Sequence, residues 1–98
     1  MAKTNPGRFF EDYCVGQVID HAVPRTVTTG ERALYHALYP MRHALYSSDD
    51  FARRCGLPAA PLDELAAFHI VFGKTVPDIS LNAVANLGYG EGRWLRPV

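Results

Sequence analysis

The sequence predicts an α+β fold in which an antiparallel sheet wraps around one central helix, with part of the sheet missing from this chain. Three observations lead to this prediction. Residues 62–74 are apolar on nearly all sides, as is typical of a helix that is buried all round by a curved sheet or a partner chain. Residues 18–27 and 79–87 have the residue types or the alternation of strands. A sheet usually has about five strands, and this chain supplies two or three.

Composition and charge limit the class of protein. The 98 residues, 48% hydrophobic and 20% charged, suit one small globular domain. Ten basic residues balance ten acidic ones, which argues against general binding to nucleic acid or to a membrane surface. No apolar run approaches the ~18 residues that span a bilayer, and the N-terminus lacks the apolar core of a secretory signal. We therefore expect a cytoplasmic protein whose cysteines, Cys14 and Cys55, are reduced.

The N-terminal region is expected to be extended. Residues 1–8 have the composition of a flexible lead-in, and the next segment turns at Gly16. The predicted strand at residues 18–27 is rich in β-branched residues. Pro24 donates no backbone hydrogen bond, which places this strand at a sheet edge or a bulge.

Capping residues predict two helices before the central one. Thr28 and Glu31 form a capping box, so a helix is expected to run to about Tyr39. Its apolar face comprises Ala33, Leu34, Ala37 and Leu38. A short helix that ends at Cys55 is capped by one of two adjacent serines, Ser47 or Ser48. Gly56 is suited to the position after that helix.

The last part of the chain predicts the central helix and two further extended segments. The helix runs from Leu62 to about Lys74, with acidic residues in its first turn. Residues 79–87 alternate as a strand does, and residues 89–95 are a possible strand loosened by glycines.

Two sequence patterns resemble a known family. A short helix of the form D-x-x-F-A, a Gly/Pro loop, the central helix and the closing phrase RWLRPV follow one another in residues 47–98. This order resembles MaoC-type proteins, whose closing phrase has the form R-F-L-x-P-V. The longer stretch of residues 7–98 is similar to the first half of the mesaconyl-CoA hydratases, also called β-methylmalyl-CoA dehydratases. These are members of the group with two hot-dog domains.

The resemblance implies a fold and a reaction. Residues 9–98 would be a partial N-terminal MaoC-like hot-dog domain. It would belong to a hydro-lyase that adds water to, or removes it from, a short branched or dicarboxylic enoyl-CoA. The CoA thioester is then the substrate, and no cofactor is expected. The expected partner is a second hot-dog domain or another copy in a homo-oligomer.

The chain departs from the family pattern where the catalytic residues should be. Active copies carry G-D-x-N-P-x-H before the D-x-x-F-A helix, and here Met41 takes the Asp position and Tyr46 the His position. Neither side chain provides carboxylate–imidazole acid–base chemistry. The central helix also begins with Leu62-Asp63-Glu64 in place of a His-Gly pair. The resemblance therefore implies a degenerate copy with no assignable catalytic residue, the Asp/His pair lying on the second copy.

Three residues are candidates for substrate binding, each with a structural alternative. Arg42 could pair with a substrate carboxylate or a CoA phosphate, or it could form a surface salt bridge. Tyr46 could line the acyl pocket or donate a hydrogen bond to the substrate, or it could be a packed tyrosine. Asp63 could contact the substrate, and a favourable charge in the first helical turn explains it equally well.

Other reactive side chains favour structural roles. His21, His36 and His43 have no metal-ligand spacing, so we expect no metal site. His69 lies on an apolar helix, where a satisfied core histidine is more common than a catalytic one.

Three functions remain open at this point: part of a hydratase or dehydratase, an inactive hot-dog module for binding or structure, and an acyl-CoA thioesterase. A D-x-N-P-x-H segment elsewhere in the protein would favour the first, and its absence the second.

Overall fold

The computed structural model describes residues 7–98, which form two compact units. The first unit combines the described part of Met1–Arg25 with Ile70–Gly92, and the second combines Thr26–His69 with Arg93–Val98. Each unit is thus built from segments that are distant in the sequence. Of the lead-in expected at residues 1–8, residues 1–6 lie outside the described residues.

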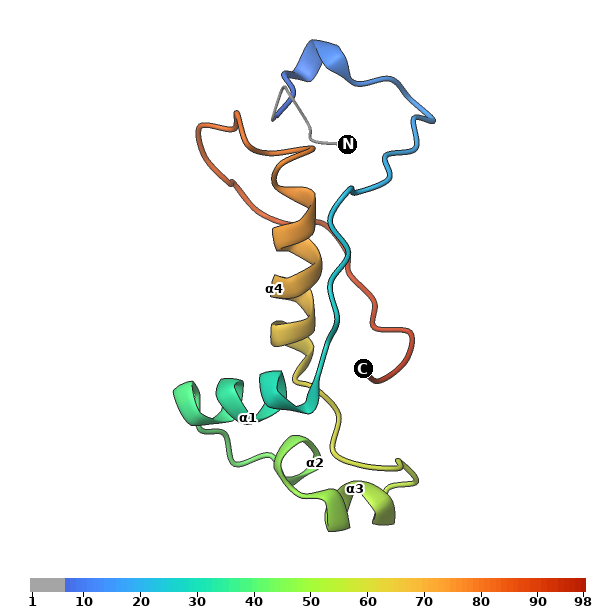
Figure 1. Ribbon diagram of the computed structural model, residues 1–98, viewed down its shortest axis with the longest axis vertical. Helices are drawn as coiled ribbons and strands as arrows, with labels where there is room; N and C mark the ends of the chain where they lie inside the picture. Colours follow the sequence, from blue (N-terminus) through green and yellow to red (C-terminus); the bar gives the residue numbers. More distant parts are fainter. Residues whose placement is uncertain (1–6) are drawn as a thin grey trace. The chain divides into compact units, whose positions relative to one another are not determined.

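Helices are the regular elements within the described part of the chain, as Figure 1 shows. In chain order they are the 3₁₀-helix η1 (Phe10–Asp12), α1 (Thr29–Leu38), α2 (Ala44–Ser47), α3 (Asp49–Arg54) and α4 (Glu64–Thr75). None of them, over the residues described, has the length and apolar character needed to cross a bilayer.

Helix α1 confirms the capping prediction. The backbone N–H of Thr28 donates to the Glu31 carboxylate at 2.5 Å, which fixes the first turn. The helix ends one residue before the expected Tyr39. Its predicted apolar face does not pack on a core, however, since Leu34 and Leu38 are 62% and 64% exposed.

Helices α2 and α3 follow directly on one another. Ser48 is the cap of α3, and its Oγ accepts a hydrogen bond from the Phe51 N–H at 3.1 Å. Gly56 follows the helix with a φ of +90°, a conformation that favours glycine. Helix α2 was not predicted from the sequence. His43 caps it by accepting the Leu45 N–H at Nδ1, at 3.2 Å.

Helix α4 confirms the position of the predicted central helix but not its burial. It spans Glu64–Thr75, close to the expected residues 62–74. Ala66 is its buried residue, whereas Leu65 and Val71 are 56% and 64% exposed. The expectation that this helix is enclosed on all sides is therefore wrong for the described chain, because no sheet forms there to enclose it.

The strand predictions for residues 18–27, 79–87 and 89–95 are corrected. No strand forms within residues 7–98, and these segments are turns or unpaired chain. A strand requires a neighbour to accept its N–H groups. Here the Ile79 N–H instead donates to the Thr75 carbonyl at 2.8 Å and extends α4 into a run of turns over residues 76–82. Figure 1 accordingly draws residues 18–27 as plain extended chain.

The buried core of the described residues is small. Its apolar members are Ala52, Ala60, Leu62 and Ala66. Asp63 and Asp78, which are 6% and 8% exposed, are buried polar residues. Burying a carboxylate is costly unless it is hydrogen-bonded or paired, so the surroundings of these two residues are informative about function.

Candidate functional site

A cavity of about 230 Å³ lies at the beginning of α4 in the second unit. Its walls come from α2, from the loop before α4, from the first turns of α4 and from the closing segment, residues 93–98. The lining residues are mostly apolar: Leu45, Tyr46, Leu57, Pro61, Leu62, Glu64, Ala67, Trp94, Leu95, Arg96, Pro97 and Val98. A concave, largely apolar surface with a few polar groups is typical of a small-molecule site.

Two hydrogen bonds hold the closing segment beside α4. The Leu62 N–H donates to the Val98 carbonyl at 2.7 Å. The indole Nε1–H of Trp94 donates to the Glu64 carbonyl at 3.2 Å. The segment RWLRPV, which carried part of the family resemblance, thus forms one wall of the cavity.

Asp63 organises the first turn of α4. Its carboxylate accepts the Leu65 N–H at 2.8 Å, and its carbonyl accepts the Ala67 N–H at 2.9 Å. The first of these bonds occupies a backbone donor that the helix itself cannot use. This geometry agrees with the structural alternative for Asp63, a negative charge at the positive end of a helix.

The phenols of Tyr46 and Tyr35 lie close to the carboxylates of Glu64 and Asp63. Burial raises the pKa of Tyr46, and a hydrogen bond to the Glu64 carboxylate and the charges of Glu64 and Asp63 raise it further. Burial, together with the charge of Asp63 and a hydrogen bond to it, likewise raises the pKa of Tyr35. Both phenols therefore remain protonated at neutral pH and act as hydrogen-bond donors.

The arrangement can hold a ligand, and its lining residues do not supply carboxylate–imidazole catalysis. The cavity offers apolar walls, the Tyr46 phenol, the Glu64 carboxylate and the Arg96 guanidinium. Because no imidazole is among its lining residues, the pair that hydration requires is not assembled here.

Comparison with known proteins identifies relatives of the chain. The chain is 82% identical over 96 residues to mesaconyl-CoA hydratase of Cereibacter sphaeroides and 66% identical over 93 residues to β-methylmalyl-CoA dehydratase of Chloroflexus aurantiacus. A solved MaoC domain protein dehydratase from Chloroflexus aurantiacus covers 89% of the chain with a TM-score of 0.79 and 66% identity. The chain is thus similar to a part of MaoC-like dehydratases. No family model matches it.

The match covers a limited part of each relative. The chain is matched over 98% and 95% of its own length, but it spans 28% and 26% of the two enzymes and 25% of the solved chain. The resemblance inferred from the sequence is confirmed for this part of the longer proteins.

The three predicted substrate-binding residues lie in different surroundings. Tyr46 lines the cavity, and the charge of Asp63 contributes to the raised pKa of Tyr46. Arg42 is exposed, lies between α1 and α2 and is not among the lining residues, so its role stays a prediction. Sequence reasoning missed Arg96 as a candidate cation, although it belongs to the RWLRPV phrase that carried the resemblance.

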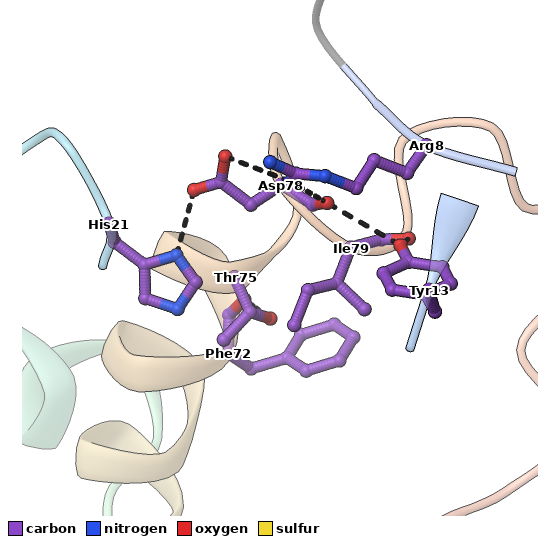
Figure 2. A network of polar contacts seen from close by, with 7 residues as sticks. All are labelled: Arg8, Tyr13, His21, Phe72, Thr75, Asp78 and Ile79. Atoms are coloured by element: carbon purple, nitrogen blue, oxygen red, sulfur yellow. Dashed lines mark hydrogen bonds and ion pairs between the residues drawn. The ribbon is translucent and has the colours of Figure 1, made fainter. Parts of the chain in front are cut away.

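A second polar cluster lies in the first unit, around the buried Asp78 (Figure 2). The Asp78 carboxylate lies 2.8 Å from Nδ1 of His21 and 3.4 Å from the Arg8 guanidinium, which also donates to the Asp78 carbonyl at 2.7 Å. The Tyr13 hydroxyl donates to the Ile79 carbonyl at 2.6 Å. These contacts join the N-terminal segment to the turns after α4, and spacing in the sequence gave no signal for them.

The histidine, the cysteines and the metal-ligating side chains considered in the sequence analysis form no further site within the described residues. His69, expected in the core, is exposed beside Phe68, with 5.8 Å between ring centroids. The core prediction for His69 is therefore wrong, because the face of α4 that carries it is not covered. Cys14 and Cys55 are free and exposed. Over residues 7–98, no three His, Cys, Asp or Glu side chains gather in a way that could hold a metal ion.

Proposed function

We propose that this chain is part of an acyl-CoA hydratase or dehydratase that acts on a short branched or dicarboxylic enoyl-CoA such as mesaconyl-CoA. The observation that supports this proposal is the 82% identity, across 98% of the chain, to a protein named mesaconyl-CoA hydratase. Substrate contacts are seldom rearranged between such close relatives, because packing around a site tolerates few volume changes.

In this proposal the chain supplies binding surface. Hydration of an enoyl thioester adds a water oxygen to the β-carbon and a proton to the α-carbon. Between these steps the negative charge lies on the thioester oxygen, as in an enolate. The steps need a paired acid and base and a donor to that oxygen. The cavity provides a protonated phenol, Tyr46, and apolar walls. The acid–base pair is proposed to lie on a second hot-dog domain or a partner copy, which would also complete the sheet around α4.

An assay on the intact protein tests this proposal. Mesaconyl-CoA is supplied, and loss of the conjugated double bond is followed alongside release of free thiol. We expect loss of the double bond without thiol release. Thiol release would indicate the thioesterase instead, and no change in either signal would indicate a module without activity.

A further inference from the structure

We propose that Arg96 binds the free carboxylate of a dicarboxylic acyl-CoA at the cavity and thereby selects it over an uncharged acyl group. This inference rests on the proposed function. It names a residue that determines which acyl group the cavity accepts.

The charge of the cavity supports this assignment. Among its lining residues, Arg96 is the cation and Glu64 the anion, and Tyr46 is a neutral donor. A carboxylate brought into apolar surroundings needs an opposite charge and hydrogen bonds. A guanidinium group provides both, since its paired N–H groups match the two carboxylate oxygens.

Arg96 differs from Arg8, Arg32 and Arg54, each of which pairs with a carboxylate, because it has no carboxylate partner within residues 7–98. Arg8 is bound to Asp78, and Arg32 donates to Asp49 at 3.1 Å and to the Ala60 carbonyl at 2.6 Å. The guanidinium of Arg96 is thus available to an external anion at the edge of a cavity.

The backbone on either side of Arg96 is held in place. Two residues before it, Trp94 is bonded to the Glu64 carbonyl, and two residues after it, Val98 accepts the Leu62 N–H. Arg96 therefore lies between two anchor points, which lowers the entropy cost of positioning its side chain for a ligand.

The volume of the cavity fits a short acyl group. At about 30 Å³ for each water in the liquid, its 230 Å³ has room for roughly eight water-sized groups. A short branched dicarboxylic acyl group has about this size, whereas the adenosine phosphates of CoA are far larger. This size favours the acyl carboxylate over a CoA phosphate as the anion at Arg96.

The test measures equilibrium binding of two unreactive thioesters to the intact protein by calorimetry. Succinyl-CoA carries a carboxylate, and butyryl-CoA has the same chain length without one. We expect Arg96→Gln to weaken succinyl-CoA binding about tenfold or more, as expected for a lost charged hydrogen bond, and to leave butyryl-CoA binding unchanged. Arg96→Lys should recover part of the loss. Arg93→Gln, in the same segment but outside the cavity lining, is the matched control.

Each other outcome overturns the inference in a recognisable way. Equal loss for both thioesters means that Arg96 contacts a group common to them, such as a CoA phosphate. Unchanged binding of both means that Arg96 contacts neither. In these two cases the proposed function stands. If the unsubstituted protein binds neither thioester, the proposed function fails, and this inference fails with it.

Discussion

Two polar regions of this chain differ in whether their charged side chains are paired with one another. In the first unit, the Asp78 side chain is 12% exposed and lies against both Arg8 and His21. In the second unit, the exposed Glu64 lines a cavity whose cation, Arg96, has no carboxylate partner within the described residues. Charges that are fully engaged with one another stabilise a fold, whereas a charge left available beside a cavity can bind a ligand. The comparison predicts that substitutions in the first region change stability and those in the second change binding.

The largest effect is expected at Asp78. Asp78→Asn removes the carboxylate that pairs with Arg8 and His21, and we expect the free energy of unfolding to fall by about 2 kcal/mol. Urea unfolding of the intact protein measures this change. The KM for the acyl-CoA substrate should remain unchanged.

The matched control is the exposed pair of Asp50 and Arg54, which are 74% and 75% exposed and 2.8 Å apart. Asp50→Asn should cost roughly 0.3 kcal/mol, because water screens such pairs. Equal effects of the two substitutions would show that the cluster around Asp78 is not the stabilising one.

The next effect is expected at the cavity wall. Ala67→Phe places a ring into the cavity, and we expect the KM for the acyl-CoA substrate to rise about tenfold, equivalent to about 1.4 kcal/mol. Steady-state kinetics of the intact protein measures it. Ala37→Phe, on the exposed face of α1, should leave KM unchanged. A KM unaffected by Ala67→Phe in a folded protein would separate this cavity from substrate binding.

A smaller effect distinguishes the two adjacent serines. Ser48→Ala removes the acceptor of the Phe51 N–H and should lower the free energy of unfolding by about 1 kcal/mol. The Ser47 hydroxyl only donates to the His43 carbonyl at 3.3 Å on the surface, so Ser47→Ala should cost less than roughly 0.5 kcal/mol. The reverse order, measured by thermal unfolding, would contradict the assignment of Ser48 as the cap.

The smallest effect concerns pH. A hydrogen bond from the Ala60 N–H, and then the charge of Arg32, lower the pKa of Asp49. A lowered pKa in the folded state means that the stabilisation is present above the ordinary carboxyl pKa, about 3.9, and is lost as pH falls through the folded value. Unfolding measured between about pH 5 and pH 3 should show a steeper loss for the unsubstituted protein than for Asp49→Asn. Parallel curves would contradict this.

Local features of the fold were predictable from sequence. Capping depends on neighbouring residues, so Thr28 with Glu31, one of the two serines and Gly56 marked helix ends that the structure confirms. The strands were not predictable in this way. The alternation of apolar and polar residues in 79–87 indicates a strand, but a strand forms only with a partner strand. Without one, the Ile79 N–H bonds to Thr75 in its own turn.

The candidate site was predictable in part for a similar reason. Tyr46 was found through its place in a motif. Arg96 and Glu64 line the same cavity because the hydrogen bonds of Trp94 and Val98 join segments some thirty residues apart. The contact between His21 and Asp78 joins residues still more distant in the chain. Such contacts depend on the packing of the whole unit, which no local pattern encodes.

The most direct measurement is a crystal structure of the intact protein with an unreactive dicarboxylic acyl-CoA such as succinyl-CoA. We expect the acyl group in the cavity at the beginning of α4, against Trp94 and Tyr46, with its carboxylate on Arg96. An acyl group bound elsewhere, with this cavity filled by protein side chains, would contradict it.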